Sequence, residues 1–317
     1  MGYGFLMYVT ASTVIYPPSL LCEVRDVILK KRMSTSHGTP PMSDYLSYTF
    51  SDSADLVSTF DEMPLWSAPF GMFLLRNLEL RRGMTVIDLG CGTGFPLFEL
   101  AERLGKSATL YGIDPWANAM ERARQKMKNY GITNVTLLET SAEHIPLAGS
   151  SVDLVISNLG INNFENSRAV FGECYRVLKS LGKLTLTTNI TGHWKEFYNV
   201  FYAALTELGL EEYALQLQHE EHHRGTIDSL SAQLTSAGFR VNRIIEESFT
   251  MRFLDGSAFL NHHFVKLGWL ASWTALFPPE QLPHIFATIE KNLNAYADVH
   301  HGLTLTVPMA FVEGVKD

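Results

Sequence analysis

The sequence predicts an α/β fold built on a mostly parallel sheet, and three observations lead to this prediction. Short apolar runs alternate with amphipathic stretches between residues 83 and 190, and several of these stretches close on a glycine. Strands that alternate with helices imply βαβ units with right-handed crossovers. Hydrophobic residues make up 46% of the 317-residue chain and charged residues 18%, which is enough apolar material for a sizeable core.

The expected elements follow in order along the chain. Bounded apolar runs predict strands, and stretches with helical spacing, which end at Gly105 or Gly131 in two cases, predict helices. The strands are expected at 84–90, 108–114, 134–140, 152–158, 183–190 and 240–253, with a last strand or strand pair at 303–316. Helices are expected at 96–105, 117–131, 167–182, 192–217 and 229–239, followed by a helical block at 257–296.

The residues before the first strand divide into two parts. Residues 1–43 form an N-terminal extension that ends in a linker rich in Ser, Thr, Pro and Gly, and residues 44–82 form an N-terminal helical cap. The first 22 residues carry no charge, but they lack the positive start of a signal peptide. Pro17 and Pro18 interrupt the apolar run that a membrane span of about 20 residues needs. We expect no stable membrane insertion.

Charge and cysteine content restrict the partners and the compartment. The formal net charge is −8 and no long Lys/Arg run is present, so nucleic acid is not an expected partner. Cys22, Cys91 and Cys174 are scattered and odd in number, which favours a reducing compartment and a cytoplasmic protein. His219 and His223 share a helix face, but no matched carboxylate or Cys pattern accompanies them, so no metal site is expected.

A glycine loop follows the first strand in VIDLGCGTG. Asp88 ends the strand, and Gly90, Gly92 and Gly94 follow at alternate positions, where backbone can approach a ligand closely. A Walker loop is disfavoured because no Lys follows. A dinucleotide fingerprint would place its third glycine at Phe95. The loop therefore suits a ligand without phosphate.

The loop resembles motif I of the class I S-adenosylmethionine-dependent methyltransferases. The similarity continues through YGIDPW, SAEHIP, VDLVISN and KLTLTTN, over roughly residues 66 to 190, and is greatest to the small-molecule, ubiquinone-biosynthesis-related group. It implies a Rossmann-like sheet of seven strands with helices on both faces and the last strand antiparallel. Residues 83–317 would be the methyltransferase domain, and the helical block 257–296 an insertion, or lid, before the last strand.

The resemblance and the chemistry of S-adenosylmethionine together assign the cofactor residues. The carbonyls of Gly90 and Asn158 are expected to face the methionine ammonium. Asp114 is expected to accept hydrogen bonds from the ribose, although an Asp before Pro115 also suits a helix start. Asp88 would orient the loop by accepting N–H bonds. The cofactor set is Asp88, Gly90, Cys91, Gly92, Gly94, Asp114, Pro115, Trp116, Ser141, Ala142, Glu143 and Asn158.

Two members of this set have a simpler alternative. Cys91 lies within the loop, where a small side chain explains it better than a nucleophile does. Trp116 can cover the adenine or belong to the core.

The family often has an acidic residue before the alanine after the third strand, whereas this chain has Ser141 before Ala142, with Glu143 next. The contact to the adenine amino group could fall to Ser141 or Glu143.

The methyl acceptor is much less well specified. Substrate candidates are Trp66, Asn162, Asn163 and Trp269, each of which also suits ordinary packing or a turn. His193 follows the fifth strand and is a weak candidate for a general base. Aromatic residues of the block 257–296 can line an apolar pocket, form the core of the block or make a dimer contact.

The leading hypothesis is an enzyme that transfers a methyl group from S-adenosylmethionine to a small molecule, with a homodimer as the candidate assembly. A non-catalytic S-adenosylmethionine-binding module is the alternative from another class. An NAD-dependent dehydrogenase is disfavoured by Phe95. The acceptor, the atom methylated and the catalytic base do not follow from the sequence.

Overall fold

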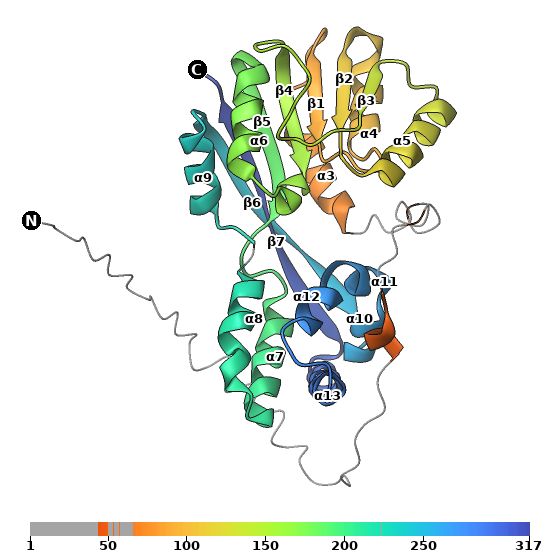
Figure 1. Ribbon diagram of the computed structural model, residues 1–317, viewed down its shortest axis with the longest axis vertical. Helices are drawn as coiled ribbons and strands as arrows, with labels where there is room; N and C mark the ends of the chain where they lie inside the picture. Colours follow the sequence, from red (N-terminus) through yellow and green to blue (C-terminus); the bar gives the residue numbers. More distant parts are fainter. Residues whose placement is uncertain (1–43, 50–52, 54–56, 58–65, 223) are drawn as a thin grey trace, which may run out of the picture.

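The computed structural model describes residues 44–49, 53, 57, 66–222 and 224–317, and within them a seven-stranded sheet forms the centre of the molecule (Figure 1). The strand order is β3-β2-β1-β4-β5-β7-β6, and only β7 runs antiparallel to its neighbours. The expected mostly parallel, seven-stranded α/β sheet is therefore confirmed. Its strands are β1 (Thr85–Leu89), β2 (Thr109–Ile113), β3 (Val135–Leu138), β4 (Val152–Asn158), β5 (Leu178–Asn189), β6 (Arg240–Phe253) and β7 (Leu303–Val315).

Several expectations fall outside the described residues. These are the extension and linker at 1–43 with Cys22, most of the segment 50–65, and His223 of the histidine pair. Of the segment 44–82, the structure describes the short helix η1 (Asp44–Ser47) and the helix α3 (Ser67–Asn77). In the described part of the chain, no helix combines the length and apolar character that crossing a membrane requires.

Helices cover both faces of the sheet (Figure 1). Successive residues of a strand point to opposite faces, so Val86 of β1 enters one hydrophobic core and Ile87 enters the other. The first core receives α3, α4 (Leu97–Leu104) and α5 (Ala117–Tyr130), and the second receives α6 (Ser167–Val177) and α9 (Ile227–Ser236). Burial on both faces explains why the central strands are continuous apolar runs.

The boundary between α6 and β5 differs from the expected one. The helical pattern predicted a helix to residue 182, but α6 ends at Val177 and β5 begins at Leu178. Leu178 is buried and pairs with Val152, and a register shift between Val152 and Leu154 accommodates the extra residues of β5. Pairing with β4 thus overrides the local helical preference of this stretch.

The strands β6 and β7 extend beyond the rest of the sheet. β5 pairs only with residues 309–315 of β7, whereas β6 pairs with all of β7 from residue 303 onward. The free half of this ribbon carries Leu303, Leu305 and Val307 into the first core, where the lower helices gather (Figure 1). These helices are α7 (Lys195–Leu208), α8 (Ala214–Glu221), α10 (Gly256–Asn261), α11 (His263–Val265), α12 (Ala271–Thr274) and α13 (Leu282–His300).

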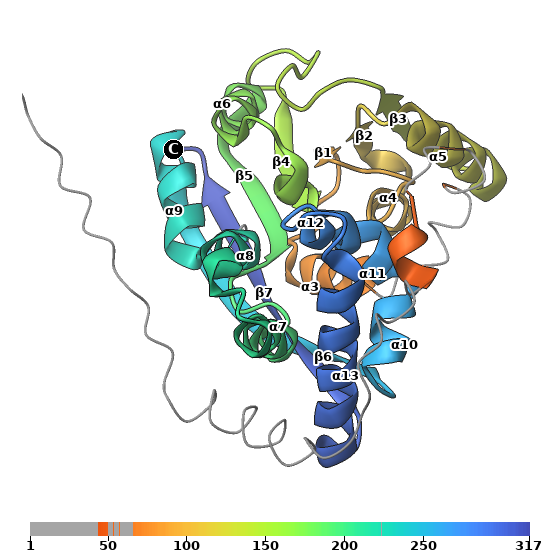
Figure 2. The same ribbon diagram turned by 60° about the horizontal axis from the view of Figure 1, so that its bottom comes forward.

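The helices α10 to α13 all lie between β6 and β7 in the sequence and form one body beside α3 (Figure 2). The long helix α13 continues past residue 296 to His300, immediately before β7. Short turns complete the chain: η2 (Gly105–Ser107), η3 (Gly160–Asn163), η4 (Glu211–Tyr213) and the π-helical η5 (Lys266–Leu270). This body brings Phe264, Gly268 and Trp269 over the carboxyl ends of the parallel strands, where they line the cavity described next.

Candidate active site

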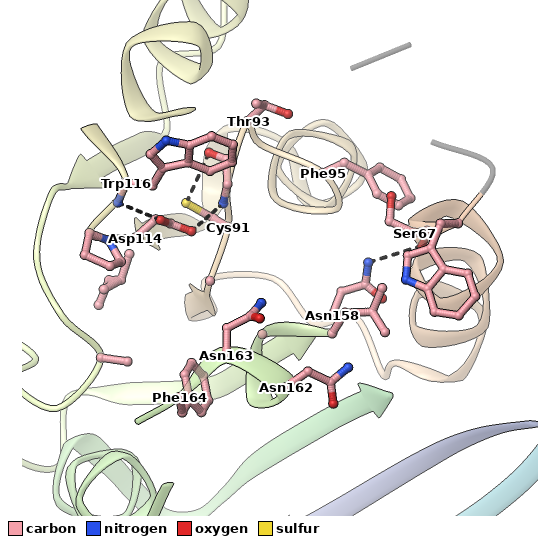
Figure 3. A pocket seen from close by; sticks show the side chains of 18 of the residues that line it. Ser67, Cys91, Thr93, Phe95, Asp114, Trp116, Asn158, Asn162, Asn163 and Phe164 are labelled. Carbon is pink, nitrogen blue, oxygen red and sulfur yellow. Dashed lines mark hydrogen bonds between the residues drawn. The ribbon is translucent and has the colours of Figure 1, made fainter. Parts of the chain in front are cut away.

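The strand order reverses between β1 and β4, because the chain goes from β1 outward to β3 and then returns to the other side of β1. Ligands of open α/β sheets bind at the carboxyl ends of the strands at this switch point. A cavity of about 1040 Å³ lies there. It is lined by the loop after β1, by residues at the ends of β2, β3, β4 and β5, and by aromatic side chains (Figure 3).

The glycine loop forms one wall of the cavity. Gly90 has a φ of 71° and Gly92 a φ of 50°, a region that side-chain-bearing residues seldom adopt. A Cβ at Gly90 would lie 3.0 Å from the Cα of Gly160, so the two backbones meet there. A Cβ at Gly92 would meet no atom within 4 Å. Gly90 is therefore required by packing, whereas Gly92 presents bare backbone to the cavity.

Asp114 lies at the end of β2 and ties this loop in place. Its Oδ2 accepts the backbone N–H of Gly92 at 2.9 Å, and its Oδ1 accepts the N–H of Trp116 at 2.9 Å (Figure 3). Burial raises the pKa of the Asp114 carboxyl, while these two N–H groups act in the opposite direction. Each oxygen has a second lone pair, so the carboxylate can still accept hydrogen bonds from a ligand in the cavity.

Asp88 does not make the contacts expected of it. Its side chain is buried beneath the loop, and neither carboxylate oxygen has a hydrogen-bond partner of normal geometry among the described residues. Burial, and next the charge of Asp114, raise its pKa well above the usual range, and the N–H of Leu97 only partly offsets this. The loop N–H of Gly92 donates to Asp114 instead.

Cys91 packs inside the loop rather than reacting from it. Its thiol lies 3.8 Å from the sulfur of Met120, and a Cβ at Gly112 would come within 2.9 Å of it. Burial raises the pKa of the Cys91 thiol well above its ordinary value, and the charges of Asp88 and Asp114 raise it further. A protonated, buried thiol is a poor nucleophile, so this position serves packing.

A second wall lies on the β2 and β3 side. Pro115 and Trp116 follow Asp114 along this wall, and the segment after β3 faces the cavity with them. There the hydroxyl of Ser141 donates to Oε2 of Glu143 at 2.6 Å, while Oε1 of Glu143 accepts the N–H of Asn166 at 3.2 Å. These bonds hold the segment around Ala142 in one conformation. The wall is largely apolar with polar groups at its edge.

Asparagine side chains line the β4 and β5 side. Asn158 donates to the carbonyl of Ser67 at 3.3 Å and accepts the hydroxyl of Thr187 at 3.0 Å, so it links α3 to the sheet. Asn162 donates to Oδ1 of Asn189 at 2.9 Å. Both asparagines at this level are oriented by protein partners, and both line the cavity.

The roof of the cavity is aromatic. Trp66 and Trp269 meet edge to face with centroids 5.2 Å apart, and Phe264 packs 5.4 Å from Trp66 and 4.8 Å from Trp269. All three line the cavity. Such edge-to-face contacts stabilise aromatic clusters beyond the burial of area. The other aromatic candidates of the block 257–296, namely Phe259, Trp273 and Phe277, lie in the core behind this roof.

His193 lies behind the roof and not in the cavity wall. Its ring stacks on Trp269 at 5.6 Å and contacts Trp194 at 4.3 Å, and both ring nitrogens are buried without a partner among the described residues. Burial, and then the charge of Arg224, lower the pKa of His193 well below its ordinary value. The imidazole is therefore neutral at pH 7, and its environment is that of a core side chain.

The structure brings nearly all expected site residues to one cavity and adds several. Of the cofactor and substrate candidates, only Asp88 and Gly94 do not line it, since Asp88 is buried beneath the loop and Gly94 packs against the ring of Phe98. Asn189 and Arg224 were missed. The end of a parallel strand was a usable signal for Asn189, but nothing in HEEHHR distinguished Arg224 from a solvated helix face. The other additions include Ser67, Thr93, Phe95, Ile113, Leu159 and Gly160.

Comparisons with known proteins agree with this geometry. A family model described as a methyltransferase domain matches residues 80–231. Demethylmenaquinone methyltransferases of Listeria welshimeri and of a Geobacillus strain are each 28% identical to this chain. The matches cover 55% and 52% of this chain, and 78% and 74% of the relatives.

Solved structures share the fold. The YcgJ protein of Bacillus subtilis superposes with a TM-score of 0.53 at 16% identity, over 78% of this chain and 98% of that protein. A putative methyltransferase of Bacillus halodurans gives 0.51 at 17% identity, with the same coverage. The fold and the site define a Rossmann-like methyltransferase. Residues 80–231 match a methyltransferase domain, and the chain is similar to class I S-adenosylmethionine-dependent methyltransferases that act on small molecules. It transfers a methyl group from S-adenosylmethionine to a small molecule.

The residues present fit this cofactor. S-adenosylmethionine supplies an electrophilic methyl on a sulfonium and carries an ammonium, a carboxylate, a ribose and an adenine. The bare backbone at Gly92, the carboxylate of Asp114 and the apolar surface of Trp116 offer complementary groups along one wall. The leaving sulfide is neutral and needs no acid. The work of the protein is to align the acceptor and exclude water, which can lower a barrier by about 7–11 kcal/mol.

Proposed function

We propose that the acceptor is a small, ring-containing, mostly apolar molecule with at least one oxygen substituent, such as a reduced quinone. The observation that carries this proposal is the composition of the cavity. It leads from the glycine loop to the roof of Trp66, Phe264 and Trp269, with the amides of Asn162 and Asn163 beside it. Flat aromatic rings and a few polar groups suit a flat acceptor that carries oxygen.

The relatives support the same class. They are named demethylmenaquinone methyltransferases, so the acceptor of those proteins is demethylmenaquinone. At 28% identity, and with the helices α10–α13 part of this chain's own roof, we propose only the chemical class for this enzyme. The substrate set is Trp66, Asn162, Asn163 and Trp269. The segment 257–296 is proposed as the lid, since it supplies Phe264, Gly268 and Trp269 to the cavity.

We propose the following roles on the cofactor side. The carbonyls of Gly90 and Asn158 bind the ammonium, and the loop from Cys91 to Gly94 positions the carboxylate. Asp114 binds the ribose, and Pro115 and Trp116 cover the adenine, whose edge faces Ser141, Ala142 and Glu143. All except Gly94 line the cavity in positions consistent with these roles. Asp88 is proposed to support the loop from below.

We also propose a cytoplasmic protein that does not bind nucleic acid. The cysteines within the described residues, Cys91 and Cys174, are unpaired, and the net charge of −8 disfavours a polyanion.

A homodimer is proposed from the edge of the sheet. Within the described residues, β6 pairs only with β7, so the outer edge of β6 is open to a second copy. Sedimentation velocity measures the oligomeric state.

The test combines binding and turnover. Calorimetry with S-adenosylmethionine, S-adenosylhomocysteine and NAD is expected to show heat with the first two only. Incubation with methyl-labelled S-adenosylmethionine and a reduced, short-chain demethylated naphthoquinone, beside a total lipid and metabolite extract, is expected to label an apolar ring product, which mass spectrometry identifies. Binding of neither sulfur ligand would refute the assignment of the cofactor site, and labelling confined to polar amines or to protein would refute the acceptor class.

A further inference from the structure

Two residues that line the cavity carry hydrogen-bond donors without an acceptor in the part of the chain that the structure describes. Arg224 lies in the segment between α8 and α9, and Asn189 is the last residue of β5; both line the cavity. Among the described residues, the guanidinium of Arg224 forms no hydrogen bond and no ion pair, and Nδ2 of Asn189 has no partner. Donors left open on a cavity wall indicate what the ligand must supply.

The backbone holds Arg224 at the end of β5. The hydroxyl of Thr191 donates to the carbonyl of Arg224 at 2.8 Å, and the N–H of Thr191 donates to the carbonyl of Gly225 at 3.1 Å. The segment that carries Arg224 is thus attached two residues beyond Asn189. This attachment brings the backbone of Arg224 close to the end of β5, and the two residues line the same cavity.

The acidic residues nearest to Arg224 in the sequence are engaged elsewhere. Oε1 of Glu220 accepts the hydroxyl of Ser272 at 2.6 Å, and Oε2 of Glu221 accepts the hydroxyl of Tyr202 at 2.9 Å. Burial lowers the pKa of Arg224, and the charges of Tyr198 and Glu220 only partly restore it. Arg224 is partly buried, and its guanidinium forms no hydrogen bond among the described residues, so a ligand that supplies an anionic oxygen would stabilise it.

Asn189 is 1% exposed, and its orientation is set by neighbours. Its Oδ1 accepts from Nδ2 of Asn162 at 2.9 Å, and Oδ1 of Asn162 in turn accepts the hydroxyl of Thr188 at 2.9 Å. This chain of bonds uses the acceptor of Asn189 and leaves its Nδ2 without a partner among the described residues, in a side chain that lines the cavity. A buried amide N–H without a partner is costly, and an oxygen of a bound molecule would satisfy it.

We propose that Arg224 and Asn189 form a subsite for an ionised oxygen of the methyl acceptor, either a carboxylate or a phenolate. A guanidinium binds such oxygens through a rigid fork of N–H groups, and an amide N–H adds a further directed bond. The subsite follows β5 and α8, whereas the cofactor loop follows β1, so the anion is held apart from the cofactor loop. This inference deepens the proposed function and rests on it for the identity of the ligand as the acceptor.

The test measures binding alone, so it does not depend on turnover. Calorimetry on the full chain, loaded with S-adenosylhomocysteine, compares 2-naphthoate with its neutral amide, and a nitro-substituted naphthol that is ionised at neutral pH with its methyl ether. The wild type is expected to bind at least one anion tenfold more tightly than its neutral partner. The pair that shows the preference distinguishes carboxylate from phenolate.

Variants assign the preference to the subsite. Arg224→Gln is expected to reduce the ratio below threefold, and Arg224→Lys to keep an intermediate ratio. Lys195→Gln, which removes the same charge from an exposed position at the start of α7, is expected to keep the wild-type ratio. Asn189→Asp, which replaces the open donor by an oxygen, is expected to weaken anion binding at least tenfold and to leave the neutral partners within threefold.

The outcomes separate this inference from the proposed function. Equal binding of anion and neutral partner by the wild type, or an unchanged ratio in Arg224→Gln, would overturn the subsite even if methyl transfer is found. If Arg224→Gln does not fold, as judged by its melting temperature and its affinity for S-adenosylhomocysteine, the Asn189→Asp ratio decides. Anion binding without any cofactor binding would instead overturn the proposed function and leave the subsite standing.

Discussion

Oδ2 of Asp114 lies 2.9 Å from the backbone nitrogen of Gly92, so the end of the second strand holds the loop that follows the first. The carboxylate of Asp114 therefore holds the loop and also lines the cavity. The N–H of Trp116 occupies its other oxygen at 2.9 Å, which fixes the plane of the carboxylate. Loop position and cofactor affinity are coupled through this residue.

The first prediction concerns the affinity for S-adenosylmethionine. Asp114→Asn removes the charge and keeps the shape, and hydrogen bonds to a charged group contribute about 1.5–3 kcal/mol each. The dissociation constant measured by calorimetry is expected to rise about 10- to 150-fold. An unchanged dissociation constant in a folded variant would refute the ribose role.

The pH dependence of the same affinity is the second prediction. The pKa of Asp114 is raised by burial, and a cationic ligand favours its ionised form. As the pH falls through this raised pKa, the carboxyl of the free protein becomes protonated, and binding must release that proton. The affinity of the wild type is therefore expected to decrease toward acid pH. The affinity of Asp114→Asn is expected to decrease less over the same pH range. Parallel profiles for the two proteins would contradict the assignment.

The third prediction distinguishes a structural role of His193 in the core from a role as the catalytic base. Its pKa is lowered well below 6.5 by burial, whereas the unfolded chain titrates at about 6.5. The unfolded state thus binds more protons, and the free energy of unfolding is expected to fall as the pH drops below about 6.5. His193→Phe should reduce this loss in urea titrations and keep kcat within about threefold. A collapse of kcat with unchanged stability would establish His193 as the base.

The fourth prediction tests the approach of two backbones beneath the cavity. A Cβ at Gly160 would lie 2.4 Å from Oγ of Ser157 and 2.7 Å from the carbonyl of Leu89, which are themselves hydrogen-bonded at 2.8 Å. Gly160→Ala is expected to lower the free energy of unfolding by about 1–3 kcal/mol. The matched control is Gly172→Ala in α6, where a Cβ meets no atom within 4 Å, and a gain of about 0.5–1 kcal/mol is expected. Equal effects of the two changes would be inconsistent with this packing.

The fifth prediction concerns the aromatic roof. Trp269→Leu removes part of the surface that faces the acceptor, and about 60 Å² of lost apolar contact corresponds to roughly 1.5 kcal/mol or tenfold. The KM for the acceptor is expected to rise about tenfold with the affinity for S-adenosylmethionine unchanged. Phe259→Leu, buried behind the roof, should lower the melting temperature without changing KM. A similar rise in KM for both variants would show that the roof acts only through stability.

Local pattern predicted most of the sheet correctly because each strand is short, apolar and bounded by a turn residue. It failed at residues 178–182, where pairing of Leu178 with Val152 extends β5 into an apparent helix. It also left the role of Asp88 open to error. Both Asp88 and Asp114 end strands beside the loop, and spacing in the sequence does not encode which of the two carboxylates accepts the N–H of Gly92.

The sequence by itself determined the fold class and the methyl donor, and it predicted the wall that we propose for the cofactor, because Gly90, Gly92 and Asp114 lie at the ends of strands whose order follows from βαβ geometry. Only the tertiary structure decided the acceptor side. Arg224, Asn189 and Trp269 come from three distant segments, and each has an ordinary local explanation. They become a site only where β5, the segment after α8 and η5 meet, since open donors and an aromatic roof are properties of that junction.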